Sequence, residues 1–227
     1  MLAAGSSGAL LHIASGNGWQ TTFVLFNASG FTAQAQLKFL DDGGNPLPLP
    51  LEFPETGATS NASSLIQSIP ANSSLWIQTS GDLTTALLTG SAQVMTSGGV
   101  TGYAIFRYNP NGQEAVVPLE TRTAGSYLIA FDNTNSTATG IALSATSSRA
   151  MNFPYLIRDA NGNQIGSGSI PLAANGHTSF MLATQIPATT GVAGTIEFDT
   201  PDEAEIAVLG IRSPPELTFT TLPALAK

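Results

Sequence analysis

The chain has 227 residues, enough for one large domain or for two domains of roughly 100 residues each. Hydrophobic residues make up 42% of the chain and charged residues only 10%, so a core is available while solubility depends on neutral polar side chains. The net charge of −8 and the seven scattered Lys and Arg residues exclude a nucleic-acid partner and argue against anionic membranes, because both need clustered cations.

Cysteine is absent, which excludes disulfides, thiolate catalysis and cysteine-ligated metals. No apolar run approaches the roughly 18 residues of a membrane-spanning helix, so no membrane insertion is expected. Residues 1–8 lack the basic and apolar regions of a signal peptide, and we expect them to form a flexible N-terminal segment. The neutral polar composition favours an extracellular or cell-surface location for a mature or truncated chain.

Short strands are predicted from residue 9 onwards. Apolar residues recur at every second position, as at Ala33, Ala35, Leu37 and Phe39, which indicates one buried face per strand. Turns rich in Gly, Asn and Asp separate the strands at intervals of roughly 8–15 residues. The predicted turns lie at 42–45, 97–99, 109–112 and 161–163, with a longer loop at about 48–64. At most a single helical turn is compatible with 82–88 and with 183–187.

The sequence repeats itself at an offset of about 118 residues. The range 10–47 lies over 128–165 without a gap, and the offset then shortens beyond the second turn. The later matches pair 69–74 with 171–177, 90–94 with 194–198, 103–107 with 208–212 and 117–119 with 221–223. Agreement in order, spacing and polarity therefore predicts a duplication, with the boundary near 120–125.

Together these features predict an all-β chain of two tandem homologous immunoglobulin-like antiparallel β-sandwich domains. Blocks of about 100 residues with short alternating strands are typical of sandwiches of roughly seven strands. Module 1 is expected at 9–122 and module 2 at 123–227. A closed barrel in each block is the alternative.

Motifs along both copies suggest a family. They are 103–107 (YAIFR), 113–119 (QEAVVPL), 131–134 (FDNT), 140–143 (GIAL), 175–180 (NGHTSF), 194–198 (GTIEF) and 219–223 (FTTLP). In these motifs the chain resembles a pair of modules from large secreted bacterial surface proteins of the acidobacterial type. The resemblance covers nearly the whole chain and implies an extracellular, non-catalytic, β-rich module. It brings no catalytic residues to transfer.

Catalytic candidates are few. The two histidines, His12 and His177, are not accompanied by a G-x-S-x-G elbow, so a Ser-His-Asp triad is not predicted. Two histidines without cysteine do not make a zinc site, and we expect neither a metal nor a cofactor. A pair of glycosidase carboxylates would need one cleft, which fits poorly with two homologous halves. The carboxylates considered are Glu52, Glu55, Glu114, Glu120 and Glu197. The chain is predicted not to be an enzyme.

Residues 159–163 (DANGN) begin like a calcium-binding loop, because their oxygen atoms recur at alternate positions. The glycine position and the bidentate acid of a complete loop are missing. The favoured interpretation is a hairpin in which Asp and Asn bond their own backbone and Gly supplies a positive φ. Residues 41–45 (DDGGN) form the counterpart in the first copy.

Aromatic side chains suggest a binding function. Trp19, Trp76, Tyr103, Tyr108, Tyr127 and Tyr155 are candidates for stacking on sugar rings, although packing in the core is their commoner role. Trp19 and Tyr108 lie next to turns and are the stacking residues that we predict. They would make the chain a glycan-binding adhesin module that recognises surface glycans.

The leading functional hypothesis is a structural or self-associating module of a bacterial surface or fibre protein, with itself as partner in a homo-oligomer or filament. Duplication, low charge and the missing catalytic motifs favour it. The flexible start followed by Leu10, Leu11 and Ile13 suggests a segment for strand exchange, which would occupy the open sheet edge of a neighbour.

Overall fold

The computed structural model describes residues 7–201, 206–215 and 218–227. The chain divides into two compact units, Met1–Thr121 and Arg122–Lys227, so the observed boundary lies one residue before the predicted one. Each unit contains two antiparallel sheets, and the all-β sandwich architecture is confirmed. Within the described ranges no helix has the length and apolar character needed to cross a membrane.

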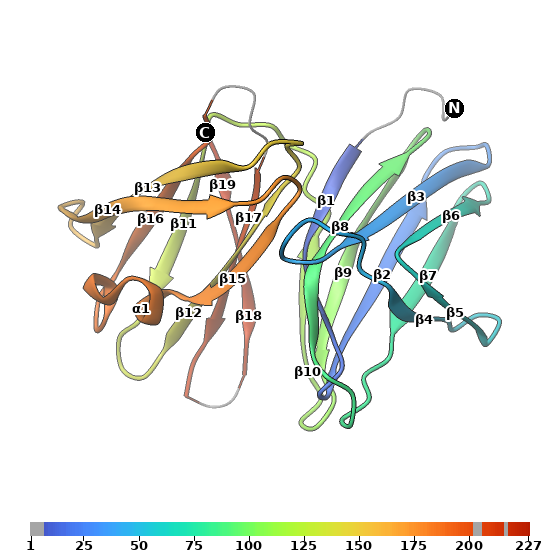
Figure 1. The fold of residues 1–227 in the computed structure, drawn as a ribbon, viewed down its shortest axis with the longest axis horizontal. Coiled ribbons are helices and arrows are strands. Elements are labelled where there is room, and N and C mark those ends of the chain that lie inside the picture. The colour runs from blue at the N-terminus through green and yellow to red at the C-terminus, as the bar shows by residue number, and fades with distance from the viewer. Residues whose placement is uncertain (1–6, 202–205, 216–217) are drawn as a thin grey trace. The chain divides into compact units, whose positions relative to one another are not determined.

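The first unit is built from a four-stranded and a six-stranded sheet, which Figure 1 shows in blue to green. The four-stranded sheet consists, in spatial order, of β1 (Ser7–Ser15), β8 (Leu88–Thr96), β3 (Ala33–Leu40) and β6 (Ser64–Ile69). The six-stranded sheet consists of β10 (Gln113–Pro118), β9 (Val100–Tyr108), β2 (Trp19–Asn27), β7 (Ser73–Thr79), β4 (Leu49–Phe53) and β5 (Ala58–Ala62).

The second unit is built from a five-stranded and a four-stranded sheet, drawn in yellow to red in Figure 1. The five-stranded sheet consists of β14 (Gln164–Leu172), β13 (Met151–Asp159), β16 (Ala193–Asp199), β11 (Ser126–Asp132) and β19 (Leu225–Ala226). The four-stranded sheet consists of β15 (His177–Met181), β12 (Ala138–Ala145), β17 (Ile206–Ser213) and β18 (Thr220–Pro223). Two short helical turns, α1 (Leu182–Gln185) and η1 (Pro187–Thr189), follow β15.

Eight strands follow the same order within the sheets of both units. The first seven pairs of equivalent strands are β1 and β11, β2 and β12, β3 and β13, β6 and β14, β7 and β15, β8 and β16, and β9 and β17; the eighth pair is β10 and β18. The register agrees as well, because Leu37 lies opposite Val94 in the first unit while Tyr155 lies opposite Phe198 in the second. These pairs are separated by the offsets that the duplication predicts.

The same type of turn connects the first two strands of each unit. Asn17 and Gly18 have φ values of 50° and 84°, and Asn135 and Ser136 have values of 49° and 63°. Positive φ at both central residues defines a type I′ turn, which Asn and Gly adopt more readily than other residues. The backbone N–H of Trp19 donates to Gly16 (3.0 Å) and that of Thr137 donates to Thr134 (2.8 Å), which closes the two turns.

Two sequence predictions need correction. The predicted loop at 48–64 contains the β4–β5 hairpin, which extends the sheet because Leu49 and Leu51 are buried. The predicted flexible segment 1–8 is wrong for Ser7 and Gly8, which pair with β8, while residues 1–6 lie outside the described residues. The range 82–88 forms a turn up to the start of β8 at Leu88, in agreement with the prediction of at most a single helical turn.

A further correction concerns the register of β9 and β17. Sequence comparison paired Arg107 with Arg212. In the structure, however, Thr21 lies opposite Phe106 and its counterpart Thr139 lies opposite Arg212. Phe106 is therefore the structural equivalent of Arg212. The error arose because apolar residues line both sides of these strands, and a slip of one residue still matches them.

Each unit has its own apolar core. In the first unit Phe23 and Phe39 are fully buried and their ring centroids lie 5.2 Å apart. The core of the second unit contains Tyr127, Phe153 and Phe198. Burial of one such side chain stabilises the folded state by roughly 1.5–3 kcal/mol. The two cores hold the sheets of each unit together and leave the outer faces and strand ends for other roles.

Candidate functional site

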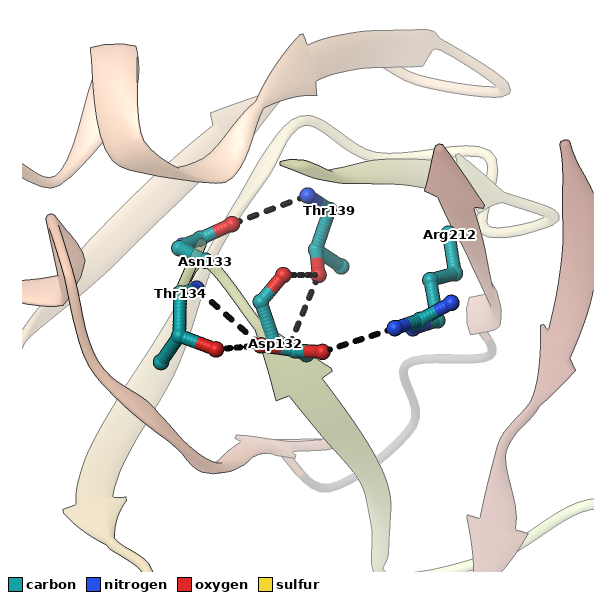
Figure 2. Close-up of polar contacts among 5 residues, drawn as sticks. All are labelled: Asp132, Asn133, Thr134, Thr139 and Arg212. Atoms are coloured by element: carbon teal, nitrogen blue, oxygen red, sulfur yellow. Dashed lines mark hydrogen bonds and ion pairs between the residues drawn. The ribbon is translucent and has the colours of Figure 1, made fainter. Parts of the chain in front are cut away.

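A polar cluster in the second unit lies at the corner where β11 turns into β12 (Figure 2). The hydroxyl of Thr139 accepts a hydrogen bond from the backbone N–H of Asp132 (2.9 Å) and donates to the carbonyl of the same residue (3.0 Å). The side-chain oxygen of Asn133 accepts from the backbone N–H of Thr139 (2.8 Å). Thr139 is fully buried, so these bonds satisfy backbone groups that water does not reach.

The carboxylate of Asp132 is held from two sides in Figure 2. One oxygen accepts from the hydroxyl (2.7 Å) and the backbone N–H (3.0 Å) of Thr134, and the other lies 3.0 Å from Nη2 of Arg212. The hydrogen bonds from Thr134, followed by Arg212, lower the pKa of Asp132 below its ordinary value. The cluster therefore fixes the ionised carboxylate at the turn.

The first unit has the same corner without the charges. The hydroxyl of Thr21 accepts from the backbone N–H of Ala14 (3.0 Å) and donates to its carbonyl (2.9 Å). Ala14 thus stands where the second unit has Asp132, and Phe106 stands where it has Arg212. The ring of Phe106 lies 5.1 Å from that of His12. The corner is a structural element of both units, and its charges belong to one of them.

Glu197 is the most enclosed of the candidate carboxylates, with 13% of its side chain exposed. It lies 2.7 Å from the ammonium of Lys227 and 3.2 Å from Nη1 of Arg158, and it accepts a hydrogen bond from the hydroxyl of Ser126 (2.8 Å). Lys227 above all, with Ser126 and Arg158, lowers the pKa of Glu197. A lowered pKa opposes the role of a general acid, which needs a raised one.

The other candidate carboxylates are dispersed. Glu114 forms an ion pair with Arg107 (2.7 Å), and Glu52 accepts from the amide of Gln78 (3.2 Å). Glu55 is exposed in the β4–β5 turn, and Glu120 bridges to Ala9 through its backbone. In the part of the chain that the structure describes, no three His, Asp or Glu side chains come together as metal ligands.

The two histidines lie in different units. His12 lies in β1 and His177 in β15, where it is buried.

The turn at 159–163 closes the β13–β14 hairpin, as predicted, and the turn at 41–45 is closed by an isolated bridge between Leu40 and Pro46. One oxygen of Asp159 accepts from the backbone N–H groups of Asn161 and Asn163, both at 2.9 Å, while Gly162 has a φ of 84°. The hydrogen bonds from Asn163 lower the pKa of Asp159. Asp41 accepts from the backbone N–H of Asn45 (2.8 Å) in the same way. Both carboxylates therefore stabilise their own turns.

The predicted stacking residues Trp19 and Tyr108 lie directly opposite each other on β2 and β9. Their ring centroids are 4.8 Å apart, with an interplanar angle of 40°, and both side chains are half-buried. Because side chains alternate along a strand, both rings share the inward side of Thr21 and Phe106. The structure thus pairs these rings with each other at the end of the sandwich rather than displaying them as a planar row.

A different group of aromatic residues lies on the outer face of the six-stranded sheet. Trp76 on β7 and Tyr103 on β9 flank Val24 of β2, which lies opposite both of them. Phe26 is the next outward residue of β2, and its ring centroid lies 6.3 Å from that of Tyr103. We call Phe26, Trp76 and Tyr103 the aromatic face. Sequence reasoning considered Trp76 and Tyr103 but missed Phe26.

A signal for the aromatic face existed in the sequence. The run from Phe23 to Phe26 is apolar at four successive positions, so apolar residues point to both sides of β2. Phe23 and Leu25 are fully buried, whereas Phe26 is 37% exposed. The remaining tyrosine candidates pack inside the second unit, since Tyr127 is buried and the ring centroid of Tyr155 lies 6.3 Å from that of Phe198.

The segment predicted for strand exchange is part of the fold of the first unit. Leu10, Leu11 and Ile13 are buried in β1, at 2% exposure or less. β1 lies at the edge of its sheet and pairs with β8 on one side, while on the other side Ala9 forms an isolated bridge with Glu120. Exchange would therefore require release of a buried strand.

Comparison with known proteins gives little. No protein-family model matches the chain, and no curated protein matches it. A crystal structure from Bacteroides fragilis, provisionally described as a β-galactosidase, aligns with 95% of this chain at 11% identity and a TM-score of 0.19. The chain spans 32% of that protein's length. A likeness at this level carries no argument about fold or function.

Proposed function

We propose that the chain is a non-catalytic structural module pair of a secreted bacterial surface or fibre protein, one that associates with copies of itself. The observation that carries the proposal is the use made of the charged side chains. Asp132 and Glu197, which form ion pairs, are held ionised by Arg212 and by Lys227 and Arg158 within their own unit. The contacts of Asp132 stabilise the corner, and those of Glu197 link β16 to β11 and β13, as a structural module requires.

Self-association would use the strand edges. β6 ends the four-stranded sheet of the first unit, and its sequence SLIQSI carries no charge. Ile66 on this strand is 61% exposed. An uncharged edge with an exposed β-branched residue is a template for pairing with another chain. The equivalent edge strand β14 contains Gly166, Gly168 and Pro171, which weaken pairing.

Light scattering combined with negative-stain imaging of the intact chain tests this proposal. Assemblies larger than a monomer are expected, and Ile66→Lys should reduce them because a charge would be placed on the pairing edge. Met95→Lys is the matched control, since Met95 shares the row of Ile66 across Gln36 but lies on the interior strand β8. A monomer at all concentrations, or assemblies that both lysine variants leave unchanged, would contradict edge pairing.

Strand exchange is tested separately, with a disulfide. The chain has no cysteine, and Ser7 of β1 lies opposite Met95 of β8. The double variant Ser7→Cys and Met95→Cys should form a disulfide within one chain if β1 stays in its own unit, and a covalent dimer if β1 is exchanged. Non-reducing electrophoresis of the assembled protein distinguishes the two.

A further inference from the structure

We propose that the aromatic face of the first unit, where Trp76, Tyr103 and Phe26 lie on adjacent strands of one sheet, binds a neutral polysaccharide. Such binding goes beyond the structural role proposed above and does not depend on self-association. The site differs from the inward pair Trp19 and Tyr108.

The geometry suits a chain of sugar rings. Trp76 and Tyr103 lie on either side of β2, so two strand spacings separate them, roughly 10 Å. That separation is close to the repeat of two sugar units in an extended β-linked polysaccharide. The indole N–H of Trp76 donates to the hydroxyl of Ser74 (3.1 Å), two residues back on the same strand. This bond directs the indole along the sheet surface.

The fold does not require the rings. Val24 lies opposite Trp76 and Tyr103, and its counterpart Ala142 lies opposite Ser179 and Leu209. Phe26 corresponds to Ser144 in the same alignment. The second unit therefore builds the same sheet with two serines and a leucine at these positions. Half-exposed aromatic rings that packing does not demand indicate a surface for a partner.

The surroundings of the rings favour a neutral ligand. The polar neighbours on the same face are hydroxyl and amide side chains, and the charged side chains there have partners. Arg107 pairs with Glu114 at 2.7 Å, and Glu52 accepts from the amide of Gln78 at 3.2 Å. The other members of this rim are Thr22, Ser74, Gln78 and Thr101. Sugar rings need an apolar platform for their C–H faces and neutral hydrogen-bonding groups at their edges. An anionic polymer would be repelled by the net charge of −8.

The exposed area suits a glycan better than a second copy of the chain. Phe26 is 37% exposed and Val116, in the same sheet face, is 48% exposed, while Trp76, Tyr103 and Ile105 are half-buried. Together they present roughly 300 Å² of apolar surface, given side-chain areas of about 150–250 Å² for aromatic residues. A stable dimer needs about 800 Å² on each partner. A few stacked sugar rings need far less.

The test is a set of adsorption isotherms of the intact chain on cellulose, chitin and an insoluble mixed-linkage β-glucan. The central variant carries Phe26→Ser, Trp76→Ser and Tyr103→Leu, which installs the residues that the second unit has at these positions. Its affinity should fall at least tenfold on any polysaccharide that the unmodified chain binds. If the triple variant does not fold, the single variant Trp76→Ala takes its place and should lose part of that affinity.

The matched control is Phe31→Ser, because Phe31 is 84% exposed in the same unit but lies outside the sheet. It should bind as the unmodified chain does. The proposal is overturned if the unmodified chain adsorbs to none of the polysaccharides, or if the folded triple and Trp76→Ala variants adsorb equally well. If the triple variant forms smaller assemblies but adsorbs as the unmodified chain does, the aromatic face is a self-association surface. That result also overturns the proposal.

Discussion

In the first unit the corner threonine Thr21 lies opposite Phe106, whereas in the second unit Thr139 lies opposite Arg212. Both hydroxyls bond the backbone of the first strand in the same way, so the hydrogen-bonded corner is common to both. The residue opposite this threonine has diverged: it is an aromatic residue in the first unit and an arginine, paired with Asp132, in the second. The comparison separates the residues that the sandwich fold requires from those that have diverged between the two copies.

The faces of the equivalent strands β7, β2 and β9 and β15, β12 and β17 also differ between the two units. Phe26, Trp76 and Tyr103 in the first unit are replaced by Ser144, Ser179 and Leu209 in the second. Because the strands and their register are the same, the fold does not require aromatic residues at these positions. Duplication therefore provides each unit with an internal control: a residue can be exchanged for its counterpart from the other copy.

The largest expected effect is in the core of the second unit, on Phe153→Ala. Phe153 is fully buried, while its counterpart in the first unit is Ala35. We expect the free energy of unfolding of the second unit to fall by about 3–5 kcal/mol, because neighbours such as Ile170 cannot fill the cavity. Calorimetry of the intact chain should show one transition moving and the other staying. Asn152→Ala, at the exposed neighbouring position, is the control, and an unchanged melting profile for Phe153→Ala would contradict the core assignment.

Thr21→Val and Thr139→Val should have an intermediate and similar effect in the two units. Each removes a hydroxyl that bonds a buried backbone N–H and carbonyl, at a cost of about 1–3 kcal/mol in the free energy of unfolding. Chemical denaturation of both variants measures this cost. Thr22→Val, on the opposite side of β2, should cost less. A large loss in only one unit would show that the corner is not shared.

The smallest effect is expected from Asp132→Asn and depends on pH. The folded-state pKa of Asp132 is lowered, so its contribution to stability is present above the unfolded value of about 3.9 and is lost as the pH falls through the folded value. The variant should be less stable at neutral pH by under about 1 kcal/mol, because the ion pair is partly exposed. Denaturation at pH 7 and at pH 2 measures the difference, which should vanish at the lower pH. A difference that persists at pH 2 would assign the effect to shape and not to charge.

Much of the fold follows from the sequence, because alternation and turn residues are local signals. The strand that carries Ala33, Ala35, Leu37 and Phe39 and the hairpin at 159–163 were predicted in this way. The β4–β5 hairpin was missed because its strands are short and interrupted by prolines at 48, 50 and 54, which resemble a loop. The register of β9 and β17 was missed because both sides of these strands carry apolar residues.

The surface sites were harder to predict. Trp19 and Tyr108 lie next to turns, which suggested exposure, but their strands direct both rings inward. Trp76, Tyr103 and Phe26 come together only because β7, β2 and β9 are neighbours in the sheet, although they are far apart in the sequence. Composition and alternation do not contain that adjacency.

Amide hydrogen exchange of the intact chain tests the central claim, that the two units share one architecture, most directly. We predict that the slowest amides lie in equivalent strands of both units, β2 and β12, β3 and β13, β8 and β16. The amides of Ala14 and Asp132 should be protected to a similar degree, because a threonine hydroxyl accepts from each. Slow exchange in non-equivalent strands, or protection of only one of these two amides, would contradict the account.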